Sequence, residues 1–303
     1  MSERKLGLLM ACTTALSWSF LAILLKLALH FFSTGTVVWF RMLIAALLMT
    51  AWAFYKRRED LKIVLGVPFA LLVAGLMIAT NYFGYMKGIE LTSASNAQIL
   101  IQLAPMSFAL LSTLMYREFP TRRQWFGLIT ALVGFGCFYW DQALASWDQL
   151  DRYQTGNLWI ILAAATWTVF ALLQKRLLKT VSSFQFNLVI YSISAFALAP
   201  TATFAEIGSA GIGPFVLLFG LGVNTIIAYG AFSEALKRIP GHQVSVIISM
   251  NPLITILVVT LMVHFQIDWI GREVIHWRGL VGALLVVSGV ITTVTGSKKR
   301  RPI

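Results

Sequence analysis

The sequence predicts an all-helical polytopic membrane protein with ten transmembrane helices, arranged as two inverted five-helix repeats with both termini in the cytoplasm. Three observations support this prediction: the composition, the placement of basic residues and an internal repeat. Of the 303 residues, 58% are hydrophobic and 12% are charged, whereas a soluble domain has about 25% charged residues. A soluble surface built from this composition would be apolar throughout, so a soluble domain is disfavoured and a disordered chain is excluded.

A spanning helix needs about 20 mostly apolar residues, and the chain contains ten such runs. The first run lacks the cleavage site of a signal peptide, so we expect it to be retained. The acidic segment 141–156 is predicted to be a periplasmic loop between a first repeat, 1–140, and a second, 157–303, which ends in a basic cytoplasmic tail. The predicted spans are 6–28, 35–55, 64–88, 95–116, 122–140, 157–177, 184–205, 214–236, 241–265 and 277–296.

The basic residues follow the alternation that ten spans require. With a cytoplasmic N-terminus, 18 of the 24 lysines and arginines fall in inside segments and five in outside segments. This asymmetry agrees with the positive-inside rule. The net charge of +12 therefore indicates membrane orientation and no nucleic-acid partner, and the predicted location is a plasma membrane of the bacterial inner-membrane type.

The two halves repeat one another at offsets of 146 to 152 residues. Ala-Leu-Ser-Trp-Ser at 15–19 recurs as Ala-Ala-Thr-Trp-Thr at 164–168, and the motif Trp-x-Gly-Leu-x-x-Ala-Leu begins at both Trp125 and Trp277. Each half has five spans, an odd number, so the second half enters the membrane from the opposite side. Inverted repeats of this kind are common in secondary transporters, whose substrate sites lie near the bilayer midplane.

These residues resemble the EamA branch of the drug/metabolite transporter superfamily. Each five-helix unit has a tryptophan-centred first helix, a proline in its fourth helix and a glycine-rich fifth helix. Arg41 and the pair Arg117-Glu118 fit the family pattern in the first half, whereas Ile190 and Phe265 stand at the corresponding positions of the second half. The resemblance implies a ten-helix exporter of small metabolites with a central cavity lined by both halves.

Motifs for enzymes, metals and cofactors are absent from the sequence. It contains no G-x-S-x-G, no H-E-x-x-H and no Walker A motif. Cys12 and Cys137 are the only cysteines and form no ligand or disulfide framework. Every acidic residue lies in a loop or near the end of a span, and the deepest, Glu234, is interpreted as an interfacial partner of Lys237 or Arg238. We therefore predict no enzyme activity, no metal and no cofactor.

Polar groups are costly inside a bilayer, so the mid-span polar residues are the candidate substrate-binding residues. The amides of Gln98 and Gln102 cannot be satisfied by lipid, and their i,i+4 spacing predicts one helix face that lines a cavity. Trp18 and Trp167 lie too deep for the interfacial aromatic belt. Two interpretations are open for each tryptophan: it lines the cavity, or it packs between helices. The candidate set is Trp18, Trp167, Tyr82, Tyr85, Tyr229, Asn81, Gln98, Gln102, Ser245, Ser249, Asn251 and Arg41.

Three further features affect the architecture. Arg41 has two open roles, because its guanidinium can bind an anion such as a carboxylate or brace carbonyls at a helix end. Pro105 and Pro252 occupy equivalent mid-span positions and predict kinks. Small-residue pairs predict tight helix contacts, within one chain or across a homodimer; they are Gly127/Ala131 and Gly279/Ala283.

The predicted function is a secondary transporter that exports a small metabolite by alternating access. A neutral cavity with aromatic and amide walls suits an amino acid or a related zwitterionic or uncharged solute, and its partners are that solute and the lipid bilayer. A membrane-embedded enzyme or lipid-handling protein is the alternative, and it requires a clustered nucleophile, base or metal. A receptor or assembly module without transport is the third hypothesis.

Overall fold

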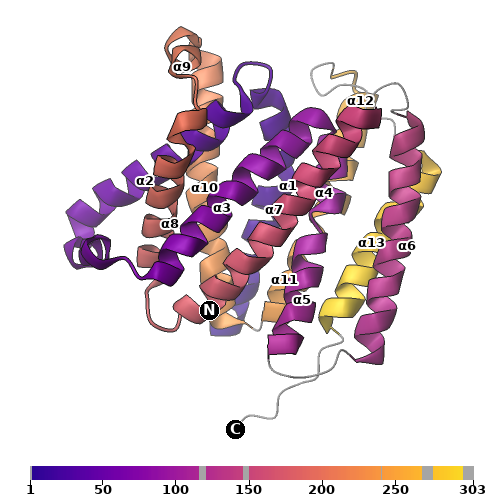
Figure 1. Ribbon diagram of the computed structural model, residues 1–303, viewed down its shortest axis with the longest axis horizontal. Coiled ribbons are helices and arrows are strands. Elements are labelled where there is room, and N and C mark those ends of the chain that lie inside the picture. Colours follow the sequence, from indigo (N-terminus) through magenta and orange to yellow (C-terminus); the bar gives the residue numbers. More distant parts are fainter. Residues whose placement is uncertain (1, 116–120, 146–149, 240, 268–275, 296–303) are drawn as a thin grey trace.

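The computed structural model describes residues 2–115, 121–145, 150–239, 241–267 and 276–295, and all regular elements in these ranges are helices (Figure 1). Eight helical segments of this part of the chain are long and apolar enough to cross a membrane, which confirms the all-α polytopic class. In chain order the elements are α1 (Glu3–Ala28), α2 (Thr34–Lys56), η1 (Arg58–Gly66), α3 (Phe69–Leu91), α4 (Ala94–Leu100), α5 (Leu103–Met115), α6 (Arg122–Ala145), α7 (Leu150–Leu177), α8 (Ser183–Leu198), η3 (Ala199–Thr201), α9 (Phe204–Ser209), α10 (Ile212–Arg238), α11 (Gly241–Ile248), α12 (Asn251–His264) and α13 (Trp277–Thr295).

The second helix of each half begins with the same serine cap. Ser33 precedes α2 and Ser182 precedes α8, and each side-chain oxygen accepts a hydrogen bond from the backbone N–H three residues later. The acceptor–donor distances are 3.4 Å to Thr36 and 3.0 Å to Gln185. Gln185 also accepts a bond from the backbone N–H of Ser182, which completes a capping box. These equivalent caps are a local sign of the repeat.

Several boundaries differ from the sequence predictions. The span predicted at 64–88 begins at Phe69, after Pro68, and the preceding residues form η1. The span predicted at 184–205 leaves the α-helix at Leu198, because Pro200 lies at the start of η3. A proline fits the first turn of a helix and interrupts its interior, which explains why both boundaries coincide with prolines.

The connection predicted at 141–156 is mostly helical. Helix α6 continues to Ala145, and α7 begins at Leu150, seven residues before the predicted span. Tyr153 and Gly156 are buried in the first turns of α7. The added turns therefore pack against protein and follow tertiary contacts that composition does not show. Arg117-Glu118, the family-like pair after α5, lies outside the described residues.

The fourth span of each half is broken, a larger change than the predicted kink. The helix is interrupted at Ile101–Gln102 between α4 and α5, and at Ser249–Met250 between α11 and α12. Pro105 and Pro252 follow these breaks. Each proline lacks the N–H that would bond the carbonyl four residues before it, and its ring crowds that carbonyl. Two equivalent prolines thus give two equivalent discontinuous helices.

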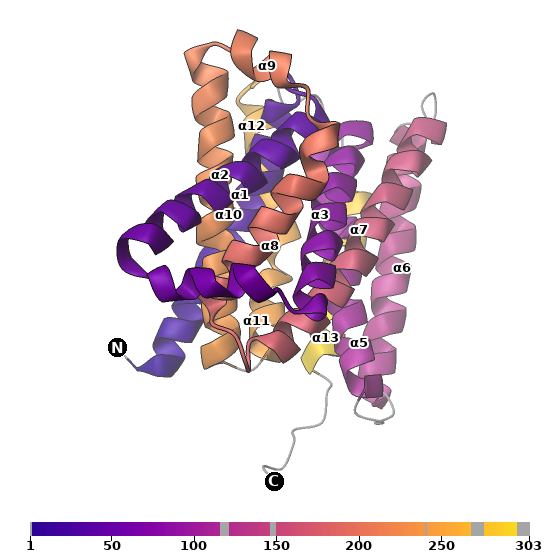
Figure 2. The ribbon, with the colours of Figure 1, turned by 60° about the vertical axis from the view of Figure 1, so that its left-hand side comes forward.

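The helices pack in pairs that repeat between the halves; Figure 1 shows α6 beside α13, and Figure 2 shows α2 beside α8. Helix α1 packs on α10 and its counterpart α7 packs on α3, whereas α2 packs on α8 and α6 on α13. Equivalent hydrogen bonds join the first two pairs: Thr14 Oγ1 donates to the Ala228 carbonyl at 3.2 Å, and Asn81 Nδ2 donates to the Ala163 carbonyl at 2.8 Å. The start of α1 and the end of α13 lie at the same end of the bundle.

Helices α6 and α13 approach each other closely enough for small residues to contact backbone. A Cβ atom added to Gly134 would lie 2.5 Å from the backbone nitrogen of Val286, and one added to Gly289 would lie 2.4 Å from that of Ala131. Gly127 meets Thr293 in the same way. The small-residue pair Gly127/Ala131 therefore forms a helix contact within one chain.

This packing predicts opposite changes in stability when two glycines of α6 are replaced by alanine. Gly134→Ala forces α6 and α13 apart, and we expect a cost of about 1–3 kcal/mol. Gly136 has no atom within 4 Å of an added Cβ, so Gly136→Ala leaves the contact intact and gains helix propensity. Thermal unfolding of the purified protein in detergent compares the two. Equal melting temperatures for both variants would contradict the backbone contact.

Candidate functional site

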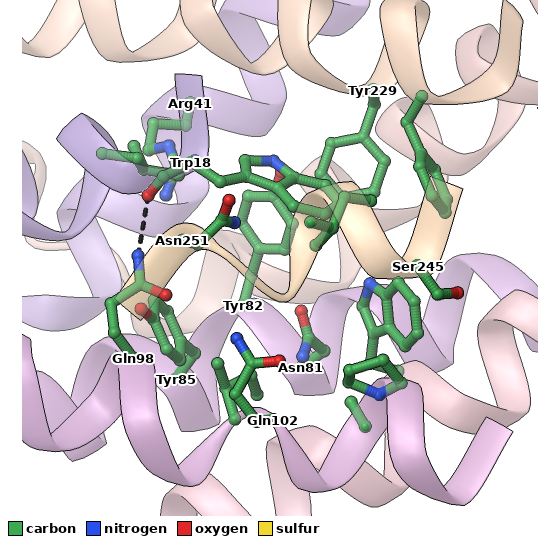
Figure 3. A pocket seen from close by; sticks show the side chains of 17 residues that line it. Trp18, Arg41, Asn81, Tyr82, Tyr85, Gln98, Gln102, Tyr229, Ser245 and Asn251 are labelled. Carbon is green, nitrogen blue, oxygen red and sulfur yellow. Dashed lines mark hydrogen bonds between the residues drawn. The ribbon is translucent and has the colours of Figure 1, made fainter. Parts of the chain in front are cut away.

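A cavity of about 100 Å³ lies between the two halves at the level of the helix breaks. This is room for several water molecules or a small solute. Figure 3 shows the side chains that surround it, which come from both repeats. Eleven of the twelve candidate residues line this one cavity: Trp18, Arg41, Asn81, Tyr82, Tyr85, Gln98, Gln102, Trp167, Tyr229, Ser245 and Asn251.

Gln98 and Gln102 both line the cavity, but they do so from two different segments, whereas one shared helix face was predicted. Gln98 lies on α4, but Gln102 lies in the break, so they do not share one helix face. Gln98 Nε2 donates to the Trp18 carbonyl at 2.8 Å, which joins α4 to α1. Gln102 is 2% exposed, and its Oε1 has no hydrogen-bond partner among the described residues. The break thus leaves one amide oxygen free to accept a bond from a solute.

Ser249 is the candidate that does not line the cavity. It lies in the second break, and its hydroxyl donates to the carbonyl of Ser245 at 2.7 Å. The i,i+4 spacing predicted that Ser245 and Ser249 would face the same way, and only Ser245 does so. Such a bond to the helix's own backbone is common for serines in membrane helices, and the assignment of Ser249 to substrate binding stays a prediction.

Aromatic rings form one wall of the cavity. The indole of Trp18 lies 5.3 Å from the Tyr229 ring and 5.4 Å from the Phe232 ring, measured between centroids. Trp167 contacts the same Phe232 at 6.0 Å. Phe232 thus joins the two equivalent tryptophans. Tyr82 completes the wall at 5.9 Å from Tyr229.

The apolar residues of the lining were not predicted from the sequence. Phe232 follows Tyr229 by three residues, so it lies on the same helix face, and that spacing would have been a usable signal. The others have no polar group to set them apart from residues that face lipid or core. They are Leu21, Ile101, Ala104, Pro105 and Ile248.

Arg41 lies on α2 and is 2% exposed. Its Cζ atom lies 4.7 Å from the centroid of the Tyr82 ring, a cation–π contact. Its Nε is buried and has no hydrogen-bond partner among the described residues. The residues that line the cavity include no aspartate or glutamate. The guanidinium therefore faces tyrosines without a counter-charge in the cavity.

The two repeats line the cavity with different chemistry. The first half contributes polar groups at Arg41, Asn81, Tyr85 and Gln98. Their equivalents in the second half are Ile190, Ala228, Phe232 and Ser245, which are apolar or smaller. In Figure 3, Arg41, Gln98 and Tyr85 gather at one end of the cavity, whereas Ser245 lies at the other. The one cationic side chain of the lining thus lies at one end of the site.

Two crevices at opposite ends of the bundle also follow the repeat. One, of about 390 Å³, includes Thr34, Lys87 and Glu90, and the Thr34 hydroxyl donates to Glu90 at 2.5 Å. The other, of about 560 Å³, includes the equivalent positions Ser183, Glu234 and Lys237. Lys87 pairs with Glu90 at 2.7 Å, and Glu234 pairs with Lys237 at 3.8 Å and with Arg238. The predicted pairing of Glu234 with Lys237 or Arg238 is thus present, and its place at the membrane interface stays a prediction.

The comparisons with known proteins agree with this architecture. The profile of the EamA-like transporter family matches residues 5–140 and 154–295. The chain belongs to the EamA-like transporter family. A Haemophilus influenzae protein named an uncharacterized transporter is 29% identical over 97% of this chain and 96% of its own length. The Escherichia coli uncharacterized inner membrane transporter YhbE is 28% identical over 98% of this chain and 93% of its own length.

A solved crystal structure shows the same fold. It has a TM-score of 0.65 and 18% sequence identity, and the match covers 96% of this chain and 98% of that one. This likeness shows that the two chains share a fold. In the described part of the chain, no three histidine, cysteine, aspartate or glutamate residues are grouped to hold a metal ion.

The lining predicts which positions meet water. In a background with Cys12 and Cys137 replaced, cysteines introduced for Gln98 and Gln102 should react with a small polar thiol reagent. A cysteine for Leu100, which packs against the hydrophobic core and does not line the cavity, should react more slowly. Mass spectrometry of the labelled protein measures the three rates. Equal inertness at all three positions would contradict a water-accessible cavity.

Proposed function

We propose that this family member is a secondary transporter that exports a small metabolite, an amino acid or a related zwitterionic or uncharged solute, across the plasma membrane. The observation that carries the proposal is the cavity between the two broken helices. Irregular backbone is tolerated at membrane depth only where protein buries it or it lines a cavity. Discontinuous helices at a repeat interface are also where transporters bind their substrates.

Alternating access is the mechanism that this arrangement supports best. The equivalent crevices at the two ends, with Thr34 and Glu90 at one and Ser183 and Glu234 at the other, provide one candidate gate for each side. In this proposal ten helices cross the membrane, α4–α5 and α6 being the two crossings added to the eight most apolar segments. Both termini then lie in the cytoplasm, which reporter fusions at the two ends test.

The alternative, a membrane-embedded enzyme or lipid-handling protein, lacks the chemistry it needs in the described cavity. Its lining contains amides, hydroxyls, aromatic rings and one guanidinium, and no carboxylate, thiol or imidazole to act as a nucleophile or base. Purified protein in sealed proteoliposomes separates the functions. We expect flux of radiolabelled amino acids or uncharged analogues along an imposed gradient, and absence of flux for the whole panel would contradict transport.

The tryptophan pair gives a sharper test of where the solute binds. Trp18→Ala and Trp167→Ala should each weaken binding by roughly tenfold to a hundredfold, because a ring contact with a solute is worth about 1–3 kcal/mol. Trp159→Ala is the control, since that indole lies on α7 beside Phe83 and does not line the cavity. Flux and melting temperature are measured for all three. Retained transport in both cavity variants, with loss of stability, would identify the pair as packing residues only.

A further inference from the structure

We propose that Arg41 is the anion-binding group of the cavity, and that the transported solute is a small monocarboxylate with an apolar body. The carboxylate lies at the Arg41 end, and the apolar body lies against Trp18 and Phe232. This inference rests on the proposed transport function and adds a substrate class and an orientation to it. It also decides between the two roles that the sequence left open for Arg41.

The Arg41 guanidinium has no counter-charge among the residues that line the cavity. A guanidinium remains protonated in proteins, and an unpaired buried charge costs several kcal/mol. Among the described residues, Arg41 forms no ion pair, and the groups that act electrostatically on it are the hydroxyls of Tyr82, Tyr85, Tyr191 and Tyr229. A phenol is not an anion at neutral pH. A charge retained at membrane depth without a partner therefore calls for one from outside the chain.

In the part of the chain that the structure describes, the donors of Arg41 are not used to stabilise the end of a helix. A residue in that role would donate hydrogen bonds to the last carbonyls of the helix. Lys26 shows what such a brace looks like in this protein, since its Nζ donates to the carbonyls of Ile89 and Thr92 at the end of α3. Arg41 has no comparable bond in the described structure, and its buried Nε is left without an acceptor. Its planar donors match a carboxylate, which can accept two parallel bonds.

The polar and aromatic side chains are distributed unevenly along the cavity. Arg41, Gln98 and Tyr85 lie together, and the aromatic wall extends away from them toward Ser245 (Figure 3). Gln102 Oε1 supplies a free acceptor, which suits an amino group on the solute. Only the first half places a cation at this position, because Ile190 stands at the equivalent position of the second half. The positive charge is therefore at one end of the cavity and not at both. A symmetric or fully apolar solute would leave both the charge and the amide oxygen unsatisfied.

Matched probes test the inference by isothermal titration calorimetry on the full chain in detergent. The probes are L-leucine, 4-methylpentanoate and the uncharged 4-methylpentanamide. We expect both carboxylates to bind the wild-type protein roughly tenfold to a hundredfold more tightly than the amide, as a charge-assisted hydrogen bond predicts. Arg41→Met should remove that preference, and Arg41→Lys should retain part of it. Arg58→Met, which changes an exposed arginine at the start of η1, should leave it unchanged.

Stability distinguishes a binding residue from a structural one. Arg41→Met should keep or raise the melting temperature, because it removes an unpaired buried charge. A lower melting temperature with unchanged carboxylate preference would assign Arg41 to bracing and overturn the inference. Chloride is the competing source of negative charge. If sodium chloride stabilises the wild type and not Arg41→Met while neither carboxylate binds, the site holds an inorganic anion and the proposal fails.

The same probes separate this inference from the transport proposal. If the amide and the carboxylates bind equally and all cross proteoliposome membranes, transport stands and the anion subsite is wrong. If none of the probes binds and the wider panel shows no flux, the proposed function itself is wrong. Carboxylate preference that disappears only in the Arg41 variants supports both.

Discussion

Backbone hydrogen bonding is the constraint on which this structure depends. In a bilayer each N–H and C=O group must find a partner within the protein, so the chain is helical wherever lipid surrounds it. The helix is interrupted at two equivalent positions, each followed by a proline in the first turn of α5 or α12. The first broken segment places Gln102 in the lining of the cavity, and Asn251 lines it directly after the second. The site exists because the backbone is irregular there.

The two halves share one helix arrangement because of the inverted repeat. They differ in the side chains that line the cavity because their sequences have diverged. Equivalent caps, equivalent interhelical hydrogen bonds and equivalent crevices occur in both halves. The cavity is different, because Arg41 faces it from the first half and the equivalent position is Ile190. In the proposed mechanism the two similar halves exchange conformations, and the unequal lining sets the direction in which an amphipathic solute lies.

Most of the cavity could be predicted from the sequence, because lipid makes polar residues conspicuous. Gln98 and Asn81 have no apolar interpretation at mid-span, and Trp18 and Trp167 lie away from the interfaces where tryptophan is ordinarily found. These arguments depend on composition and depth alone. The repeat then paired the residues across the two halves.

The remaining features depend on tertiary contacts. Ser249 was expected on the face of Ser245, but it lies in the break before α12 and does not line the cavity. Phe232 carries no polar group, so apart from its spacing to Tyr229 it is identified by its contacts with both indoles. The early start of α7 follows burial of Tyr153 and Gly156 against other helices. No hydropathy pattern contains that information.

Filling the cavity tests the central claim most directly. Ala104 is buried in the lining near the first break, and Ala104→Leu adds about three methylene-sized groups to the space that a solute would occupy. Ala51→Leu makes the same change on the exposed face of α2. We expect the first variant to remain folded and to lose flux of every solute that the wild-type chain carries, while the second retains it. Full flux through a folded Ala104→Leu protein would show that solutes pass elsewhere.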